Sequence, residues 1–150
     1  PITVVSNLPY SSGTAILQLL AEHPHRIRAM ILMFQAEVAQ RLRATPDHDG
    51  WGSLSLWIQN SWEVAAVTSV PPGAFSPPPE VNSEVVLMKP RAQLRIPETL
   101  GKLELYDKLL RVAFAHRRKM LRSSIPKASP YFQSLLNTSI EGSRRAESLT

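Results

Sequence analysis

The fold of this chain is decided by residues 1–10, PITVVSNLPY. The run over residues 2–5 is β-branched throughout and does not alternate apolar with polar residues. Such a run is typical of a strand that is buried on both faces of a sheet. The strand is predicted to end at residues 7–10, NLPY, because proline cannot continue regular strand pairing. The stretch therefore predicts a covered sheet with a polar motif at the carboxyl end of one strand.

Strand and helix patterns alternate beyond this stretch. The predicted elements are a helix that begins at Ser11 or Ser12 and ends before Pro24, a strand over residues 29–34, helices over 35–42 and around 54–58, and strands around 64–70 and 84–89. Alternation of this kind favours a largely parallel α/β sheet. The last two strands are expected to form an antiparallel pair at one edge of it.

A rigid loop is predicted between those last two strands. Residues 70–79, VPPGAFSPPP, contain five of the thirteen prolines in the chain. Proline lacks a backbone N–H and has a fixed φ, so this segment is neither a helix nor a central strand. A stiff loop with one aromatic residue, Phe75, holds that side chain in one place. Phe75 is therefore a candidate functional residue.

The chain opens directly inside an apolar strand, which needs neighbours on both sides. We therefore expect residues 1–90 to be the second half of a larger α/β domain whose first half lies outside this chain. The length of 150 residues corresponds to one domain, or to one domain with a small appendage.

After Pro90 the pattern changes to that of a small all-helical subdomain, expected over residues 91–150 and incomplete at its C-terminal end. Residues 102–116 have helical spacing, with apolar side chains such as Tyr106 and Leu110 on one face. The basic stretch at residues 116–122, HRRKMLR, is predicted to continue this helix, and a short helix is predicted over residues 131–136.

The two parts of the chain differ in charge. Residues 1–90 contain five Lys or Arg and seven Asp or Glu, whereas residues 91–150 contain twelve and five. A near-neutral first part and a strongly basic second part indicate that the second part meets a polyanion. Nucleic acid is favoured over an anionic membrane surface.

The composition also excludes several kinds of site. There is no cysteine, which excludes a disulfide scaffold, a zinc-thiolate site and a cysteine nucleophile. No apolar run approaches the length of a membrane span, and the first residues do not resemble a signal peptide. The four histidines have no metal-ligand spacing. We therefore expect a cytoplasmic, monomeric protein with no metal and no membrane partner.

The motif Asn7-Leu8-Pro9-Tyr10 fits methyl transfer to an exocyclic amine, whose lone pair is delocalised into a purine ring. Two neutral acceptors, the Asn7 side-chain oxygen and the Leu8 carbonyl, would hold the amine hydrogens and stabilise the positive charge that develops on nitrogen. Leu8 precedes Pro9 and is therefore biased to an extended conformation that presents this carbonyl. Tyr10 would stack on a flipped base, and Phe75 would close its other face.

A simpler interpretation of each feature stays open. The motif could be a turn that ends a strand, with Asn7 as a local hydrogen-bonding cap. The basic residues at 117–122 could be a solvated helix face rather than a contact to RNA.

Four ordered motifs resemble those of the ribosomal RNA adenine dimethyltransferases of the KsgA type. They are residues 7–10, NLPY; residues 34–42, FQAEVAQRL; residues 70–83, VPPGAFSPPPEVNS; and residues 117–122, RRKMLR. The resemblance implies a Rossmann-like class I methyltransferase sheet and S-adenosylmethionine as the cofactor. It implies dimethylation of the 6-amino group of two adjacent adenosines in a hairpin near the 3′ end of small-subunit ribosomal RNA. It also implies a role in ribosome biogenesis.

The same resemblance assigns roles to residues of this sequence. Asn7 corresponds to the asparagine between the methionine end of the cofactor and the target amine, and Leu8, followed by Pro9, supplies the carbonyl. Tyr10 and Phe75 correspond to the base-stacking aromatics. The RNA-facing basic residues are Arg117, Arg118, Lys119 and Arg122.

The chain departs from the family pattern in several places. The glycine-rich cofactor loop and the acidic cofactor contacts precede the NLPY motif in the family and are not in this sequence. Glu80, Asn82 and Ser123 stand where Lys, Asp and Asn are usual, and the chain ends at Thr150, before a further family helix. We therefore expect this chain alone to be inactive and to bind the cofactor weakly or not at all.

Two other functions stay open. A non-catalytic RNA-binding assembly factor, or a transcription-factor relative, would keep the fold without turnover. A large-subunit RNA methylase that confers antibiotic resistance would modify a different RNA. The intact NLPY motif favours an enzyme over the first, and the proline loop and basic segment favour the small-subunit enzyme over the second.

Overall fold

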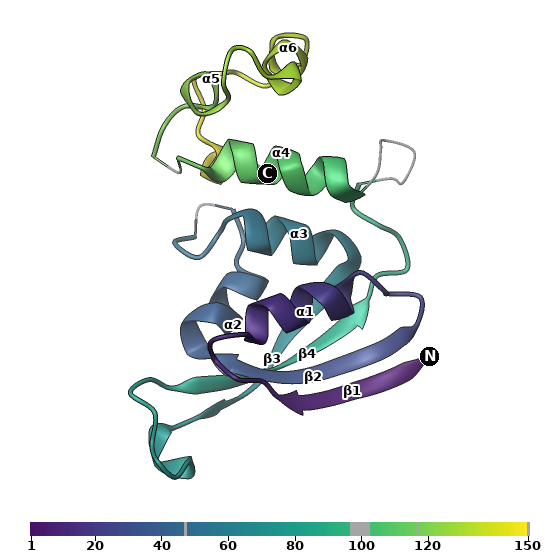
Figure 1. Cartoon of the computed structure of the whole chain (residues 1–150), viewed down its shortest axis with the longest axis vertical. Coiled ribbons are helices and arrows are strands. Elements are labelled where there is room, and N and C mark those ends of the chain that lie inside the picture. The colour runs from purple at the N-terminus through teal and green to yellow at the C-terminus, as the bar shows by residue number, and fades with distance from the viewer. Residues whose placement is uncertain (47, 97–102, 117, 150) are drawn as a thin grey trace.

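The computed structural model describes residues 1–46, 48–96, 103–116 and 118–149. The strands are β1 (Ile2–Asn7), β2 (Ile27–Gln35), β3 (Trp62–Val70) and β4 (Ser83–Pro90). The helices are α1 (Gly13–Ala21), α2 (Ala36–Arg43), α3 (Ser53–Ser61), α4 (Leu103–Phe114), α5 (Leu121–Ser124) and α6 (Pro130–Leu136), with short 3-10 turns η1 (Pro72–Ala74) and η3 (Ala146–Ser148). Helices α1, α2 and α3 cover one face of the sheet, and the later helices lie beyond α3 (Figure 1). Within the described residues, no helix has the length and apolar character of a membrane span.

The sheet has the strand order β1-β2-β4-β3. The β1–β2 pair is parallel, whereas β4 runs antiparallel to both β2 and β3. The antiparallel pair joined by the proline loop is confirmed. As predicted for a largely parallel sheet, β1, β2 and β3 run in the same direction, and β4 runs against them. A short hairpin can join only antiparallel neighbours, and here its second strand, β4, lies between β2 and β3. The antiparallel pairing therefore extends into the middle of the sheet.

The first strand is not the buried strand that its composition predicts. β1 forms the edge of the sheet, with Ile2 63% and Val5 71% exposed. An apolar run indicates that a strand is suited to burial on both faces. Within the described part of this chain, however, β1 pairs only along the side that faces β2. β1 thus presents an exposed apolar edge.

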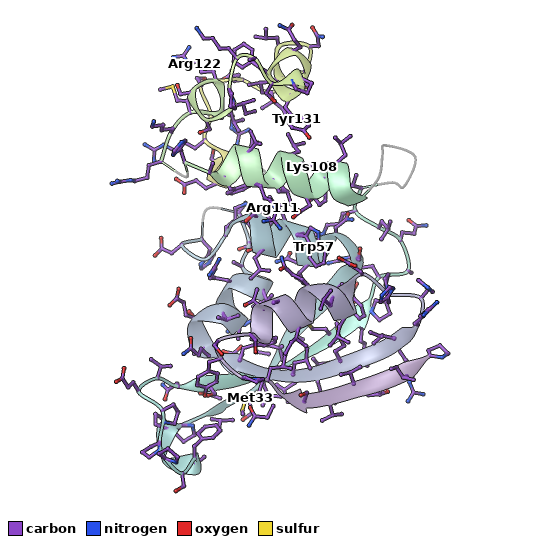
Figure 2. The ribbon with its side chains drawn as sticks, in the orientation of Figure 1. Met33, Trp57, Lys108, Arg111, Arg122 and Tyr131 are labelled. Atoms are coloured by element: carbon purple, nitrogen blue, oxygen red, sulfur yellow. The ribbon has the colours of Figure 1, made fainter. Side chains whose placement is uncertain are left out.

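The core lies between the sheet and the helix layer. Alternate residues of β2 are buried beneath the helices (Met30, Leu32 and Phe34), whereas Met33 lies on the opposite face of the sheet (Figure 2). The Trp62 Nε1 donates to the Ala21 carbonyl at 3.0 Å and ties β3 to the end of α1. On α1, Leu17 is buried in this core, whereas Leu19 is 66% exposed.

The segment after β4 fastens the helical part of the molecule to α3. The amide of Arg95 donates to the Asn60 carbonyl at 3.1 Å, and the Asn60 Oδ1 accepts from the Ile96 amide at 2.9 Å. The Tyr106 hydroxyl on α4 donates to the Leu56 carbonyl at 3.2 Å. Burial raises the pKa of Tyr106 to about 12, against a smaller lowering by Arg95. The proposed boundary after residue 90 stays a prediction.

The basic segment does not continue the preceding helix as predicted. α4 ends at Phe114, Met120 forms an isolated antiparallel bridge with Arg145, and α5 begins at Leu121. The Leu121 amide donates to the Arg144 carbonyl at 2.8 Å. The backbone of this segment is therefore held by the C-terminal part of the chain rather than by helical bonds. The predicted helix over residues 131–136 is confirmed as α6, and residue 102 lies outside the described residues.

Candidate functional site

The NLPY motif and the proline loop share one edge of the sheet. The register pairs Asn7 at the end of β1 with Met33 on β2, while Gln35 at the end of β2 and Val70 at the end of β3 both pair with Ser83. The loop between β3 and β4 extends beyond the carboxyl ends of β1 and β2 (Figure 1). Two motifs more than sixty residues apart in the sequence thus meet at the edge where α/β sheets bind ligands.

The NLPY motif combines one buried side chain with exposed neighbours. The Leu8 side chain is buried in the core, whereas Asn7 and Pro9 are exposed. The Pro9 carbonyl accepts from the amides of Ser12 and Gly13, at 3.2 and 2.7 Å, which closes the turn into α1. A buried anchor and a hydrogen-bonded turn hold the backbone on both sides of the Leu8–Pro9 peptide. An exposed neutral amide, Asn7, therefore sits on a fixed backbone.

Tyr10 combines an accessible ring with a tethered hydroxyl. The residue is 36% exposed, and its hydroxyl is hydrogen-bonded to the Ser83 hydroxyl at the start of β4. Ser83 is fully buried. Ser83 is the last residue of the motif at residues 70–83, and no sequence pattern indicated a role for it. This bond links the NLPY motif to the strand that leaves that loop.

Phe75 lies in a loop held by short-range backbone bonds. The amides of Ala74 and Phe75 donate to the carbonyls of Pro71 and Pro72, at 3.0 and 3.1 Å, and the Ser76–Pro77 peptide is cis. The Phe75 side chain is half-buried. Among the described residues the ring pair in contact range is His23 with His25, so Tyr10 and Phe75 do not stack on each other. Two rings that enclose a third planar group must be separated in this way.

A cavity of about 400 Å³ lies beside this loop. It is lined by Gln35, Ala36, Glu37, Pro72, Glu80, Val81 and Asn82. Two of these lining residues are bonded to each other, since the Ala36 amide donates to the Asn82 carbonyl at 2.9 Å. Glu37 and Glu80 bring two carboxylates to this edge of the sheet, and negative charge disfavours a phosphate there. The surroundings suit a neutral group, such as a base, better than a phosphate.

An ion pair next to Ser83 fixes the start of β4. The Arg43 guanidinium donates to both carboxylate oxygens of Glu84, at 2.9 and 3.1 Å. Glu84 is buried, and two parallel bonds to a planar guanidinium specify its orientation. This pair was not predicted, because residues forty-one positions apart have no spacing that indicates contact.

The predicted RNA-facing residues lie far from Asn7. Arg118, Lys119 and Arg122 are exposed, whereas Arg117 lies outside the described residues. Figure 2 places Arg122 on α5 and Lys108 and Arg111 on α4, on the side of α3 away from the sheet. The helical part and the proline loop occupy opposite ends of the molecule (Figure 1). The structure therefore divides the sequence-predicted residues into two separate groups.

Comparison with known proteins places the whole chain in one family. The family model for "Ribosomal RNA adenine dimethylase" matches residues 1–150. The chain is 38% identical over its full length to Ribosomal RNA small subunit methyltransferase A of Syntrophotalea carbinolica, of which it covers 58%. It is 44% identical over 83% of its length to the protein of the same name from Phenylobacterium zucineum, of which it covers 43%. The chain thus spans about half the length of these curated relatives.

Solved structures share the fold. A dimethyladenosine transferase from Plasmodium falciparum superposes with a TM-score of 0.77 over 98% of this chain and 62% of its own, at 21% identity. The 23S rRNA methyltransferase ErmE gives 0.66 over 96% of this chain and 58% of its own, also at 21% identity. At this identity the likeness concerns the fold alone, and it agrees with the expected Rossmann-like methyltransferase sheet followed by helices.

Proposed function

Because the chain belongs to the ribosomal RNA adenine dimethylase family, we propose that it is part of a longer protein that methylates adenosine in small-subunit ribosomal RNA. The donor is S-adenosylmethionine, and the acceptors are the 6-amino groups of two adjacent adenosines in a hairpin near the 3′ end. The observation that carries the proposal is the exposed Asn7 on its anchored turn, at the sheet edge that the proline loop overhangs. The exposed apolar edge of β1 supports a longer protein, since such an edge favours pairing with a further strand.

The motif would act on the amine through hydrogen-bond acceptors. The Asn7 Oδ1 and the Leu8 carbonyl each accept one N–H of the target amine and thereby direct its lone pair away from the ring. Both acceptors are neutral dipoles on a fixed backbone, so they stabilise the positive charge that develops on nitrogen without reorganising. When bound, S-adenosylmethionine would supply an electrophilic methyl group, and Asn7 would lie between its methionine end and the target amine.

The aromatic residues would hold the adenine itself. Tyr10 stacks on one face of the flipped base and Phe75 covers the other, and each stacked base is worth about 1–3 kcal/mol. The carboxylates of Glu37 and Glu80 near this edge keep phosphates out, so the base enters and the backbone stays outside.

The basic residues would bind the RNA backbone at a distance from the chemistry. Arg118, Lys119 and Arg122, with Arg117 from the sequence motif, contact phosphates that orient the subunit and carry no base information. In this proposal the longer protein is monomeric and cytoplasmic and acts in ribosome biogenesis.

The test is transfer of labelled methyl groups from S-adenosylmethionine by the longer protein. Small ribosomal subunits that lack the modification should accept label, whereas fully modified small subunits and large subunits should not. Binding of unmodified small subunits without any transfer would instead support a non-catalytic assembly factor. Label in the large subunit alone would point to the antibiotic-resistance type of enzyme.

A further inference from the structure

We propose that Ser83 is a positioning residue that fixes the ring of Tyr10 for the target base. This inference rests on the proposed function, in which Tyr10 stacks on the flipped adenine. No other described contact of the Tyr10 side chain is as specific as its hydroxyl bond to Ser83. A ring that is 36% exposed is only partly held by packing, so a bond at its far end fixes the direction in which the side chain points.

Ser83 is built into the most constrained point of this sheet edge. It is fully buried, and its backbone pairs with Gln35 of β2 on one side and with Val70 of β3 on the other. On either side of it, the Asn82 carbonyl accepts the Ala36 amide at 2.9 Å, and the Glu84 carboxylate accepts both bonds of Arg43. Because the Ser83 hydroxyl is fixed relative to the sheet, its bond to Tyr10 fixes the Tyr10 side chain relative to the sheet as well.

The bond also assigns a purpose to the Tyr10 hydroxyl. A phenylalanine would stack on a base equally well, because stacking uses the ring face and not the hydroxyl. Since the hydroxyl is bound to Ser83, it orients the ring and does not take part in proton transfer. The expected consequence is a change in the rate of transfer rather than in RNA affinity, because phosphate contacts elsewhere supply most of the affinity.

The experiment compares Ser83→Ala, Tyr10→Phe and the double variant in the longer protein. Each single variant removes the same bond, so each should lower kcat about tenfold, the effect of losing one hydrogen bond of about 1.4 kcal/mol. The double variant should be no slower than either single variant, because the bond can be lost only once. KM for the RNA should change little. With 2-aminopurine at the target position, all three variants should quench its fluorescence less than the wild type does.

Ser69→Ala is the matched control. The Ser69 hydroxyl donates to the Ser83 carbonyl at 3.5 Å, so this variant removes a hydroxyl from the same hairpin end without touching Tyr10. It should keep wild-type kcat and quenching. Tyr10→Phe changes the more exposed partner, so the test does not depend on the folding of Ser83→Ala.

Tyr10→Ala distinguishes a failure of the proposed role of Ser83 from a failure of the proposed stacking role of Tyr10. If it slows transfer strongly while Ser83→Ala and Tyr10→Phe leave kcat unchanged, or if their effects add, the role of Ser83 is wrong and the proposed function stands. If Tyr10→Ala itself leaves transfer unchanged, the stacking role of Tyr10 fails and the inference about Ser83 falls with it.

Discussion

The sheet edge and the helical part of this molecule are stabilised in different ways. At the edge, paired strands and long-range bonds such as Tyr10–Ser83 and Arg43–Glu84 fix each backbone from more than one side. The helical part packs short helices around four buried residues, Leu121, Ile125, Leu135 and Ala146. Methyl transfer to an amine needs acceptors held within fractions of an ångström, whereas phosphate binding tolerates looser placement. Under the proposed function, we therefore expect the edge to carry the chemistry and the helical part to supply RNA affinity.

The largest expected effect comes from removing the exposed acceptor at the edge. Asn7→Ala in the longer protein should lower the single-turnover rate of methyl transfer by about 10²–10³-fold, the effect of losing one preorganised group in a transition state. The affinity for unmodified small subunits should stay at the wild-type value, which filter binding can measure. A parallel loss of affinity and rate would contradict the division of labour between the two regions.

A cavity in the small helical core should separate the stabilities of the two regions. Leu121 is buried on α5, and Leu121→Ala should lower the free energy of unfolding by about 2–4 kcal/mol. Hydrogen exchange should show faster opening of α4, α5 and α6 while β2 and β4 keep their protection. Leu136, which is 63% exposed, provides the control variant Leu136→Ala. Equal loss of protection in the sheet would show that the regions unfold as one unit.

Neutralising the exposed basic segment should affect binding alone. In the variant with Arg118, Lys119 and Arg122 all changed to Gln, RNA affinity should fall about 10- to 100-fold at moderate salt. The salt dependence of log K should become shallower by about 3, one for each lost phosphate contact. The single-turnover rate at saturating RNA should be unchanged. An unchanged salt slope would identify these residues as a solvated surface.

The smallest effect is a pH dependence at the junction between α3 and α4. Burial holds the pKa of Tyr106 at about 12, above the value of about 10 for an unfolded chain. The neutral phenol is therefore favoured by folding, and its contribution is complete below pH 10 and is lost as the pH rises from about 10 to 12. Urea unfolding at pH 8 and pH 11 should show a smaller decrease in stability for Tyr106→Phe than for the wild type. An equal decrease in both proteins would contradict this assignment.

Sequence patterns predicted the elements of the edge better than their pairing. The apolar runs and the proline loop marked strands 29–34 and 84–89, because burial and proline geometry act locally. The antiparallel insertion of β4 beside β2 was not predicted, since pairing is decided by contacts between distant segments. The Tyr10–Ser83 bond was missed for the same reason, although both residues lie in motifs that the sequence analysis quoted.

In the helical part, the sequence predicted two helices correctly but did not predict where the first of them ends. The spacing around Tyr106 and Leu110 correctly indicated α4, and the stretch ending at Leu136 indicated α6. The continuation through the basic segment was wrong, because helix propensity does not reveal that Met120 would pair with Arg145. The apolar spacing of a helix can continue in the sequence although the helix itself is interrupted, as it is here between α4 and α5.

The most direct test of this account is the identity of the product nucleoside. The longer protein is incubated with S-adenosylmethionine and unmodified small subunits, and the RNA is digested and analysed by mass spectrometry. We predict adenosine that is dimethylated on its 6-amino group. The Asn7→Ala variant should form much less of this product than the wild type does. Methylation of a ring carbon or a ribose would contradict this prediction, because the two proposed acceptors, the Asn7 side-chain oxygen and the Leu8 carbonyl, would hold an exocyclic amine.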